Sequence, residues 1–401
     1  MSSHDTATWP AVRLGELVKL TSGQSPSGFK FGSTGKPYFK VDQLGKATKY
    51  LGRASTPYLS GAIPDVPAGS VLIAKRGGAI ALNRVRLLTE PGFMDTNVMA
   101  LSSTGGIEPE FLYYWLSYRG LWDIADVTSV PQINNKHINP LEIALPSLSE
   151  QRTIVTVLRD ADNLITTLER QISKKQAIKQ GMLQELLTGR TRLPGFGAPW
   201  NSIALGTIGS FLKGRSVKRD DVRSSGVPCI RYGELYTDFV NYTAVTRSFV
   251  RDEIAATALP IQSGDLLFAG SGETREEIGM CVAYVGDAPA VAGGDIVILR
   301  GKDFNPVFLA TLANAPIVAN QKARAGQGDA VVHISSRALA SINVEIPSFA
   351  EQDAIARVLV DADREIHALK SSLTKTRAIK QGMMQELLTG LTRLPVEDGA
   401  A

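Results

Sequence analysis

The sequence has little of what marks secreted, membrane-spanning or zinc-binding proteins. It contains only two cysteines, Cys229 and Cys281, which lack the close CxxC spacing of a zinc site. We therefore expect two free thiols and no metal, as is usual in a reducing cytoplasm. No apolar run reaches the ~18 residues that a membrane span needs, and residues 1–11 have neither the basic nor the apolar segment of a secretory signal. These absences predict a cytoplasmic protein without membrane contact.

Motifs of the common enzyme classes are missing as well. There is no GxxxxGK[ST] phosphate loop, and Gly270-Ser271-Gly272 stands without the rest of a dinucleotide-binding fingerprint. His137 and His333 each lie singly near the end of a globular segment, with no paired nucleophile in view. A surface or hydrogen-bonded histidine is therefore a better interpretation of each than a catalytic base. We expect a binding protein without catalytic residues.

The overall composition is that of an ordinary folded protein of two or three domains. Of the 401 residues, 44% are hydrophobic and 20% are charged, and the formal net charge is +4. This mild excess of positive charge is compatible with a polyanionic partner, but many other proteins share it. The charge alone therefore permits nucleic-acid binding without arguing for it.

The chain contains an internal duplication. Residues 146–194 and 347–395, which are 201 positions apart, are identical at 29 of 49 positions, most densely in AIKQGMLQELLTG against AIKQGMMQELLTG. The segments before them match more faintly, for example Pro37–Leu44 against Pro228–Leu235. Such self-similarity means that one structural unit occurs twice. The two copies keep one framework and differ in their surfaces.

Each copy of the conserved segment has the pattern of one long amphipathic helix. Ser147-x-x-Glu150 and Ser348-x-x-Glu351 are capping boxes, and Gly189 and Gly390 suit the position just after a helix. Between them, apolar residues recur at spacings of four and three, which is typical of a coiled-coil seam. The seam residues that we assign to helix pairing are Ile154, Leu158, Ile165, Leu168, Ile355, Leu359, Ile366 and Leu369.

A helix of about 40 residues, roughly 60 Å long, is too long to pack on one small domain only. We therefore expect the two helices to pair antiparallel, with an internal pseudo-twofold axis. Packing of each helix on its own domain alone is the alternative. Gly181 and Gly382, inside the helices, indicate either the close approach of another helix or a harmless remnant of the duplication.

The segments outside the helices are predicted to be β-rich heads. Strands are expected at 71–74, 98–101, 265–269, 280–285 and 295–299, and short helices at 109–118 and 305–314. The predicted domains are the heads 1–146 and 195–346 and the helical segments 147–194 and 347–401. The predicted fold class is α+β, with two β-rich heads separated by two long antiparallel coiled-coil helices.

Polar and basic side chains cluster at the ends of the predicted strands in both heads. Arg and Lys suit the acceptors of guanine, Asn and Gln suit adenine, and carboxylates can accept from cytosine, so these clusters are candidate DNA contacts. Each of them alone is more simply a solvated loop residue, and the set is more suggestive than its members. The candidates are Lys40, Asp42, Gln43, Lys75, Arg76, Asn83, Arg84, Gln132, Asn134, Asn135, Lys213, Arg215, Arg231, Tyr232, Glu234, Glu273, Thr274, Arg275 and Gln327.

Two repeated motifs carry a resemblance to a known family. They are the Pro-x-x-x-Glu-Gln helix start, at Pro146–Gln151 and Pro347–Gln352, and the KQGM-x-QELLTG helix end. With them the chain resembles, over nearly its whole length, a Type I restriction-modification specificity subunit with two target-recognition domains. The heads keep the family framework only loosely: Val130–Asn134 precedes the first helix, and Gln327–Asp329 stands in its place in the second head.

The resemblance implies a function in phage defence. Each head would read one half of a split, asymmetric site in double-stranded DNA from the major groove, and the paired helices would set the unread gap. The helices would also dock two methyltransferase subunits, which bring S-adenosylmethionine, and the complex would recruit restriction subunits that use ATP. The specificity subunit itself would carry no cofactor. The alternatives are the specificity component of another phage-defence methylation system, a coiled-coil protein-interaction scaffold without DNA binding, and a stand-alone enzyme.

Overall fold

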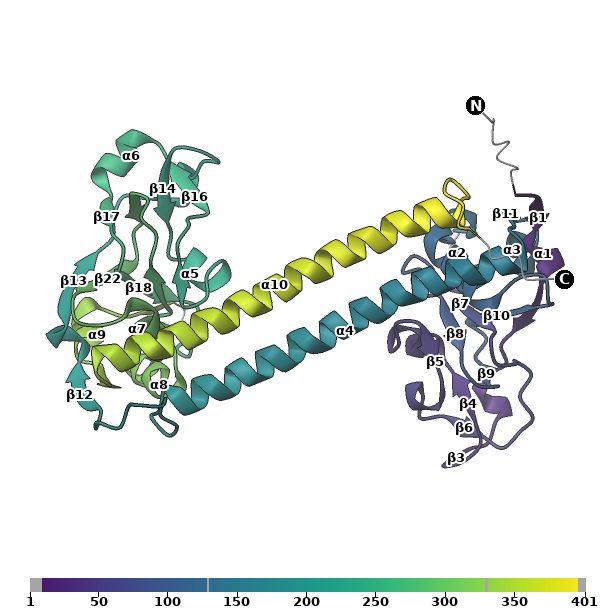
Figure 1. Ribbon diagram of the computed structural model, residues 1–401, viewed down its shortest axis with the longest axis horizontal. Helices are drawn as coiled ribbons and strands as arrows, with labels where there is room; N and C mark the ends of the chain where they lie inside the picture. Colours follow the sequence, from purple (N-terminus) through teal and green to yellow (C-terminus); the bar gives the residue numbers. More distant parts are fainter. Residues whose placement is uncertain (1–8, 128–129, 329–330, 396–401) are drawn as a thin grey trace. The chain divides into compact units, whose positions relative to one another are not determined.

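The chain packs into two units, each with a β-rich head and parts of two long helices (Figure 1). The computed structural model describes residues 9–127, 130–328 and 331–395, so both ends of the predicted domain scheme, 1–8 and 396–401, lie outside the described residues. Unit 1 comprises Met1–Arg170 and Lys370–Ala401, and unit 2 comprises Gln171–Leu369. The combination of sheet-rich heads with long helices confirms the α+β class, whereas the predicted domain boundaries stay a prediction.

The head of unit 1, the first head, is built around a five-stranded sheet in the order β2-β10-β7-β8-β5. The strands of this sheet are β2 (Val18–Ser22), β10 (Val98–Ser103), β7 (Val71–Ala74), β8 (Arg86–Leu88) and β5 (Tyr50–Leu51). The other strands are β3 (Phe31–Gly32), β6 (Leu59–Ser60), β4 (Lys36–Phe39) and β9 (Phe93–Met94), which form a four-stranded sheet in that order, and the pair β1 (Ala11–Arg13) and β11 (Glu142–Ala144). The helices are α1 (Leu14–Leu17), α2 (Pro109–Arg119) and α3 (Asn135–Ile138), with short 3-10 turns η1 (Pro26–Gly28), η2 (Val41–Gly45), η3 (Arg53–Ser55) and η4 (Trp122–Ile124).

The head of unit 2, the second head, repeats this plan around the five-stranded sheet β13-β22-β18-β20-β15. The strands of this sheet are β13 (Gly209–Lys213), β22 (Ile296–Gly301), β18 (Leu266–Ala269), β20 (Cys281–Tyr284) and β15 (Tyr242–Thr243). A four-stranded sheet contains, in this order, β16 (Ser248–Val250), β14 (Val227–Ile230), β21 (Ala290–Ala292) and β17 (Leu259–Ile261). Two further pairs are β12 (Asn201–Ala204) with β24 (Asn343–Ile346) and β19 (Ser271–Gly272) with β23 (Val332–His333). The helices are α5 (Glu234–Thr237), α6 (Asp252–Thr257), α7 (Pro306–Ala313), α8 (Pro316–Ala325) and α9 (Ser336–Ala340), with 3-10 turns η5 (Leu205–Thr207) and η6 (Arg219–Asp221).

The central sheets of the two heads share one topology. In each sheet the first four strands pair antiparallel and the edge strand pairs parallel, β5 with β8 and β15 with β20. Strands β7 and β18 are buried along their whole length, because both faces of the sheet are covered. The strands and short helices predicted from the sequence are all confirmed, with ends within two residues of the predicted ones.

The two conserved segments form the long helices α4 (Leu148–Leu186) and α10 (Phe349–Leu388), of 39 and 40 residues. Their predicted caps are present. The backbone N of Glu150 donates to Ser147 Oγ (3.2 Å) while the backbone N of Ser147 donates to the Glu150 carboxylate (3.4 Å). At the start of α10 the backbone N of Glu351 donates to Ser348 Oγ (3.4 Å). The box of α4 is thus reciprocal, whereas among the described contacts α10 has the serine half of its box and the Glu351 carboxylate pairs with Arg192. These bonds satisfy backbone donors that the first helical turn would otherwise leave free.

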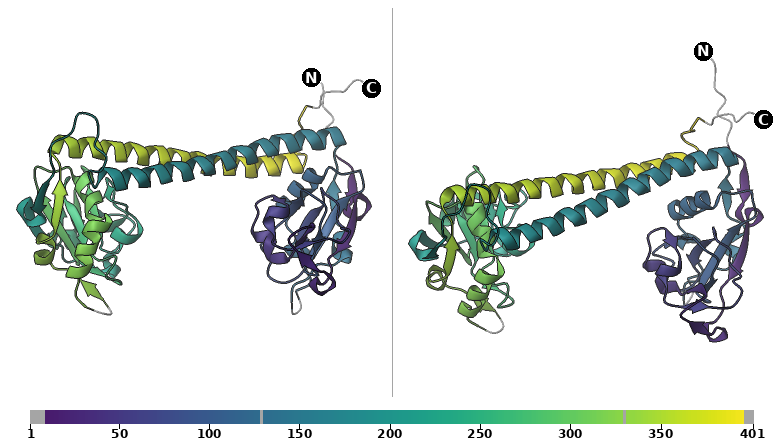
Figure 2. Two further views of the ribbon diagram at one scale, coloured as in Figure 1. Left: turned by 90° about the horizontal axis from the view of Figure 1, so that it is seen from below. Right: turned by 60° about the horizontal axis from the view of Figure 1, so that its bottom comes forward.

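Within each unit α4 and α10 run antiparallel and side by side (Figures 1 and 2). In unit 1, Glu169 pairs with Arg377 (2.6 Å) and Asp162 with Lys380 (2.5 Å). In unit 2, Lys175 pairs with Glu365 and Lys179 with Asp363, both at 2.5 Å. Because residue numbers rise along α4 as they fall along α10, the predicted antiparallel pairing is confirmed in both units. Surface ion pairs of this kind fix the helix register more than they add stability.

The starts of the two helices are part of the head cores. Ile154 and Leu158 of α4 lie in the core of the first head, together with the last turns of α10. Ile355 and Leu359 of α10 lie in the core of the second head, together with the last turns of α4. Each head therefore buries the start of one helix and the end of the other. The alternative in which each helix packs on its own domain alone is wrong.

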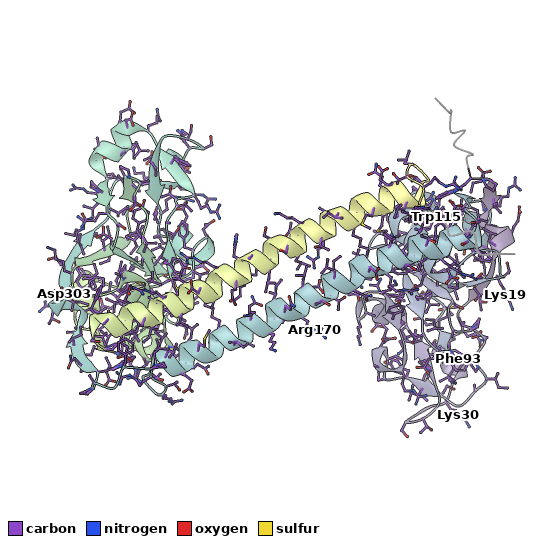
Figure 3. The ribbon with its side chains drawn as sticks, viewed as in Figure 1. Lys19, Lys30, Phe93, Trp115, Arg170 and Asp303 are labelled. Atoms are coloured by element: carbon purple, nitrogen blue, oxygen red, sulfur yellow. The ribbon has the colours of Figure 1, made fainter. Side chains whose placement is uncertain are left out.

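The middle of the seam is buried outside the head cores. Leu168 and Ile172 are each 8% exposed and Ile366 is 7% exposed, although none of the three belongs to a head core. Ile165 and Leu369 are half-buried. These positions belong to the stretch of α4 and α10 that carries the ion pairs between the two helices. Figure 3 labels Arg170, the last residue of α4 that belongs to unit 1.

The repeated glycine after each helix packs against a tryptophan. Gly189 and Gly390 have positive φ angles of 65° and 75°, the left-handed conformation that glycine adopts most easily. A Cβ added at Gly189 would lie 3.3 Å from the ring of Trp200, and one at Gly390 would lie 3.1 Å from the ring of Trp9. Backbone conformation and space both require glycine here, which explains why the helix-end motif is kept in both copies.

An arginine just past each glycine ties the end of one helix to the start of the other. Arg192 lies over the Trp200 ring and pairs with Glu351 (2.6 Å), the capping-box residue of α10. Arg393 lies over the Trp9 ring and pairs with Glu150 (2.5 Å), the capping-box residue of α4. The conserved helix start and the conserved helix end therefore meet within each unit.

Gly181 and Gly382, inside the helices, are exposed, and a Cβ at either position would meet no described atom within 4 Å. The close approach of another helix of this chain, one of the two interpretations of these glycines, is therefore wrong for the part of the chain that the structure describes.

These two kinds of glycine lead to opposite expectations. Gly181→Ala and Gly382→Ala are each expected to stabilise the chain by about 1 kcal/mol, because alanine restricts the unfolded chain and the helix has room for it. Gly189→Ala or Gly390→Ala is expected to destabilise it by about 1–2 kcal/mol, because the left-handed conformation strains any residue with a Cβ. Urea unfolding of the four variants measures both signs. A shift in the same direction at all four sites would contradict this account.

Both cysteines are free, as predicted. Both are also buried, and burial raises the pKa of each thiol to about 12. In the part of the chain that the structure describes, no cluster of three or more His, Cys, Asp or Glu side chains could hold a metal ion. Among the same residues, no helix combines the length and the apolar content that a membrane crossing requires.

Candidate nucleic-acid interface

Several predicted DNA contacts of the first head meet at the end of β7. Arg76, two residues after the strand, forms an antiparallel bridge with Gln132, and the backbone N of Ile133 donates to the Lys75 carbonyl (2.9 Å). The Lys75 ammonium donates to Ser22 Oγ (3.0 Å). Asn134 and Asn135 follow directly at the start of α3. The structure thus brings together Lys75, Arg76, Gln132, Asn134 and Asn135, which come from two distant parts of the sequence.

The other candidates of the first head differ in their exposure and in their contacts with the rest of the head. Asp42 is exposed, and the Lys40 ammonium lies 3.8 Å over the ring of Tyr58. Asn83 donates to the carbonyls of Leu116 and Ser117 (3.3 and 3.0 Å) and is half-buried, so its amide nitrogen holds its own head together. Arg84 is half-buried.

The candidates of the second head are mostly exposed. The exposed ones are Lys213, Arg215, Tyr232, Glu273, Thr274, Arg275 and Gln327. Arg275 donates to the carbonyls of Gly326 and Gly328, both at 3.2 Å, and so lies against the backbone on either side of Gln327. The Arg231 guanidinium pairs with the buried Glu234 (3.2 Å), which leaves it half-buried.

Gln43 and Glu234 are not DNA contacts. They are 2% and 3% exposed, and they occupy the matching position of the two heads. The backbone N of Lys40 donates to Gln43 Oε1 (2.5 Å), and the backbone N of Arg231 donates to Glu234 Oε2 (3.0 Å). Each side chain closes the turn after a strand and satisfies a backbone donor. The prediction is wrong at these two positions because a buried cap cannot reach a base.

His333 is an exposed, hydrogen-bonded histidine, in agreement with its interpretation from the sequence, although its partner had not been identified. The Oγ of Ser271, which is 4% exposed, lies 2.9 Å from His333 Nδ1. His333 also bridges Gln327, just as Gln132 bridges Asp126 in the first head. The residue that matches Gln132 is therefore His333, and Gln327 matches Asp126. The earlier assignment of 327–329 to the place of 130–134 is wrong, and Asp329 itself lies outside the described residues.

The missed pair Ser271–His333 had a signal in the sequence. The offset of 201 that aligns the two helices also relates Gln132 to His333 and Ile133 to Ile334. Extending the helix alignment toward the head would have found this correspondence. The hydrogen bond to Ser271 had no such signal, because 62 residues separate its two partners.

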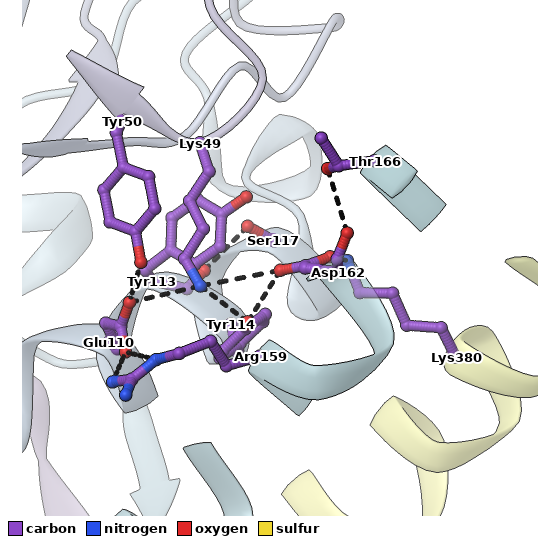
Figure 4. Close-up of polar contacts among 10 residues, drawn as sticks. All are labelled: Lys49, Tyr50, Glu110, Tyr113, Tyr114, Ser117, Arg159, Asp162, Thr166 and Lys380. Carbon is purple, nitrogen blue, oxygen red and sulfur yellow. Dashed lines mark hydrogen bonds and ion pairs between the residues drawn. The ribbon is translucent and has the colours of Figure 1, made fainter. Parts of the chain in front are cut away.

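A buried polar network joins the first head to α4 and α10 within unit 1 (Figure 4). Lys49, 6% exposed, donates to the Tyr114 hydroxyl (2.6 Å) and lies 3.2 Å from the Glu110 carboxylate. Tyr114 donates to Asp162 of α4 (2.6 Å), and Asp162 pairs with Lys380 of α10. This network fixes the orientation of the first head on the helices.

The network shifts the pKa of its members. Burial lowers the pKa of Lys49, against the attraction of Glu110 and Asp162. Burial also opposes the ionised form of Glu110, but hydrogen bonds from Arg159, Tyr50 and Lys49 outweigh it and hold the pKa of Glu110 below its ordinary value. Burial and the bond to Asp162 raise the pKa of Tyr114.

The pKa of Glu110 predicts an acid-sensitive contribution to stability. A carboxyl group with a lowered folded-state pKa stabilises the folded chain above its ordinary pKa of 4.5, and this contribution is lost as the pH falls below that value. Glu110→Gln is therefore expected to lower the free energy of unfolding by about 1–3 kcal/mol at pH 7 and by less at acidic pH. Urea unfolding between pH 3 and 7 measures the difference. Glu142→Gln, at an exposed carboxylate of β11, is the control, and equal pH profiles for both variants would refute the assignment.

Comparison with known proteins finds likenesses to one family. Residues 7–180 match the family model of the Type I restriction modification DNA specificity domain. The Type I restriction enzyme MjaVIII specificity subunit of Methanocaldococcus jannaschii is 23% identical over 421 residues, covering 96% of this chain and 93% of that protein. Both likenesses are to DNA specificity domains or subunits of Type I restriction systems.

Solved structures of Type I systems share the fold. The S subunit of the Type I restriction-modification system from M. genitalium matches with a TM-score of 0.60 at 15% identity, over 97% of this chain and 98% of that one. A chain solved to explain complex assembly and conformational transition of the type I R-M system matches with a TM-score of 0.58 at 19% identity, over 95% of this chain and 98% of that one. Taken with the family model and the curated relative, this shared fold confirms the resemblance inferred from the helix motifs.

Proposed function

We propose that this chain is the DNA-recognition subunit of a Type I restriction-modification complex, in which each head reads one half of a bipartite, asymmetric DNA site. One contrast supports the proposal most. The helix starts, helix ends and arginine ties are the same in both units, whereas the heads share a backbone topology and differ in the side chains they expose. A common framework with two different surfaces is suited to reading two different sequences.

The proposed DNA contacts are the candidates that remain accessible. Exposed and half-buried basic and amide side chains can position phosphates and read base edges in the major groove. In the first head they are Lys40, Asp42, Lys75, Arg76, Arg84, Gln132, Asn134 and Asn135, and in the second head they are Lys213, Arg215, Arg231, Tyr232, Glu273, Thr274, Arg275 and Gln327.

The helices would set the gap between the half-sites. A helix of 39 or 40 residues is roughly 60 Å long, the length of about 17 base pairs at 3.4 Å each. This length suits two short half-sites and an unread segment between them.

The same helices would dock two methyltransferase subunits. Ile178 and Ile379, at matching positions, are 46% and 61% exposed. One turn further along, Gly181 and Gly382 leave room for a second backbone, since no described atom lies within 4 Å of a Cβ there. Because the exposed isoleucine and the glycine recur at matching positions of α4 and α10, each helix offers the same surface to one methyltransferase subunit. These subunits would carry S-adenosylmethionine, and the restriction subunits of the complex would use ATP.

Duplex binding tests the proposal. The purified chain with its methyltransferase partner is expected to prefer one bipartite duplex over random DNA, and its affinity is expected to fall steeply as salt rises, because phosphate contacts release counterions. Binding of random and bipartite duplexes with equal affinity would refute the sequence-reading function. Absence of any duplex binding would favour the protein-interaction scaffold. Sequence-specific binding with a different set of partners would favour another phage-defence methylation system.

A further inference from the structure

Three chain segments meet at the end of the central strand of each head, with the same backbone hydrogen bonds in both. In the first head, Ile133 N donates to the Lys75 carbonyl (2.9 Å), and Asp126 and Gln132 exchange two N–H···O bonds of 2.9 Å. In the second head, Ile334 N donates to the Gly270 carbonyl (2.9 Å). There Gln327 and His333 exchange the matching bonds, of 2.9 and 2.7 Å. We call this arrangement the three-segment junction.

Two buried apolar positions of the junction carry the same residue in both heads, and the other positions differ. The isoleucine that follows the bridge, Ile133 or Ile334, is 0% or 3% exposed, and the last residue of the central strand is a buried alanine in both heads, Ala74 and Ala269. The four remaining positions all differ between the heads. They carry Lys75, Arg76, Asp126 and Gln132 in the first head and Gly270, Ser271, Gln327 and His333 in the second.

This pattern distinguishes the junction from the other candidate contacts. Because the backbone and the buried residues are the same in both heads, each side chain starts from the same place. A substitution therefore changes the hydrogen-bonding groups at the surface and leaves the backbone where it is. Arg and Gln are side chains that read bases, and His has two ring nitrogens that can form hydrogen bonds. In the first head Arg76 and Gln132 stand directly opposite each other. Such a frame with exchangeable side chains is what a sequence-reading surface requires.

In the second head the junction holds a histidine in a fixed orientation. Ser271 is 4% exposed, and its Oγ lies 2.9 Å from Nδ1 of the exposed His333. Tyr236 donates to the Ser271 carbonyl (3.0 Å) and so holds the strand that carries the serine. With Nδ1 engaged, Nε2 is the other hydrogen-bonding atom of the ring. A ring already held in one orientation loses less entropy when it binds.

We propose that the three-segment junction is the base-reading element of each head, and that His333, oriented by Ser271, reads a purine of the half-site recognised by the second head. Gln132 reads the corresponding position in the first head, where glutamine suits adenine. His333 Nε2 bonds to the major-groove edge of the purine. Ser271 is a positioning residue that acts through His333. This inference rests on the proposed function and names the residues that give it specificity.

The test exchanges the reading residue between the heads. His333→Gln places in the second head the residue that the same backbone carries at Gln132, so the variant is expected to fold. The full chain with its methyltransferase partner selects duplexes from a randomised library, and the bound duplexes are sequenced. His333→Gln is expected to change the base preference at one or two positions of one half-site by about tenfold or more, and to leave the other half-site unchanged. The reciprocal Gln132→His is expected to change only the other half-site.

His367→Gln is the matched control, because it makes the same substitution at an exposed position of α10 outside both heads. It is expected to select the wild-type sequence. If His333→Gln also selects the wild-type sequence, the junction does not read bases and the inference is overturned. If the wild-type chain selects no sequence at all, the proposed function itself has failed, which is a different result.

Ser271 is tested by its effect on discrimination. Ser271→Ala is expected to keep the preferred base and to reduce the preference for it several-fold, because the imidazole is no longer held. Ser271→Thr keeps the hydroxyl and is expected to restore the preference. Unaltered discrimination in Ser271→Ala would overturn the positioning role, since a merely structural serine would change the yield or the unfolding midpoint without changing the base preference.

Discussion

Ile165→Asp combined with Ile366→Asp is expected to open the helix pair in both units and to abolish specific DNA binding, while both heads remain folded. Ile366 is 7% exposed and Ile165 is half-buried, and neither belongs to a head core. Burying a carboxylate without a partner costs several kcal/mol. The acidic residues already on the helices, such as Asp162 and Asp363, add repulsion.

Trypsin digestion and duplex binding measure this outcome. Lys174 and Lys175 are exposed already, but trypsin cleaves unfolded backbone and the paired helices hold theirs folded. Opened helices unfold locally there, so the double variant is expected to be cut at these lysines much faster than the wild type, with the heads surviving as fragments. Wild-type cleavage rates together with wild-type binding would contradict the role of the seam.

The control places the same two charges on the exposed side of the helices. Ile178→Asp with Ile379→Asp changes residues that are 46% and 61% exposed, so the helix pair is expected to stay closed and resistant to trypsin. Under the proposed function the same control variant is expected to lose the methyltransferase. The two double variants make the same kind of substitution. They therefore separate the pairing of α4 with α10 from the docking of the methyltransferase.

The sequence predicted the fold well because its signals are local or repeated. Capping boxes, the four-and-three spacing and the glycines after each helix are patterns within one segment, and the structure has a helix where they predict one. The strands in the centre of each sheet were found for the same reason, since short apolar runs such as 71–74 are buried along their whole length. The arginine ties were not predicted, because Arg192 and Glu351 are 159 residues apart and only the fold brings them together.

The candidate site was predicted less well because exposure decides it, and exposure is a property of the folded chain. Gln43 and Glu234 have the same polar character as their exposed neighbours, and only the turn that they cap shows that they are buried. Lys49 is a similar case, since its charge suits a surface but Tyr114 and Glu110 hold it inside. A polar residue type alone cannot distinguish a cap or a buried ion pair from a DNA contact.

Lengthening both helices is expected to lengthen the gap in the recognised DNA site. Seven residues inserted after Arg170 and seven after Leu369, where the two helices pass from one unit to the other, keep the seam in phase because the heptad repeats. Seven helical residues add about 10.5 Å, which equals about three base pairs of duplex at 3.4 Å each.

The selected sites are expected to keep both half-sites and to contain a gap about three base pairs longer. Their affinity is expected to be lower, because three base pairs turn the second half-site by about 100° around a duplex with 10–10.5 base pairs per turn. Selection from duplexes with variable gaps, or methylation sequencing in a host that carries the variant, measures the gap. Insertion into α10 alone is the control and is expected to abolish binding, because the ion pairs of α4 and α10 can no longer form in both units. A variant with both insertions that still selects the original gap would show that the helices do not set it.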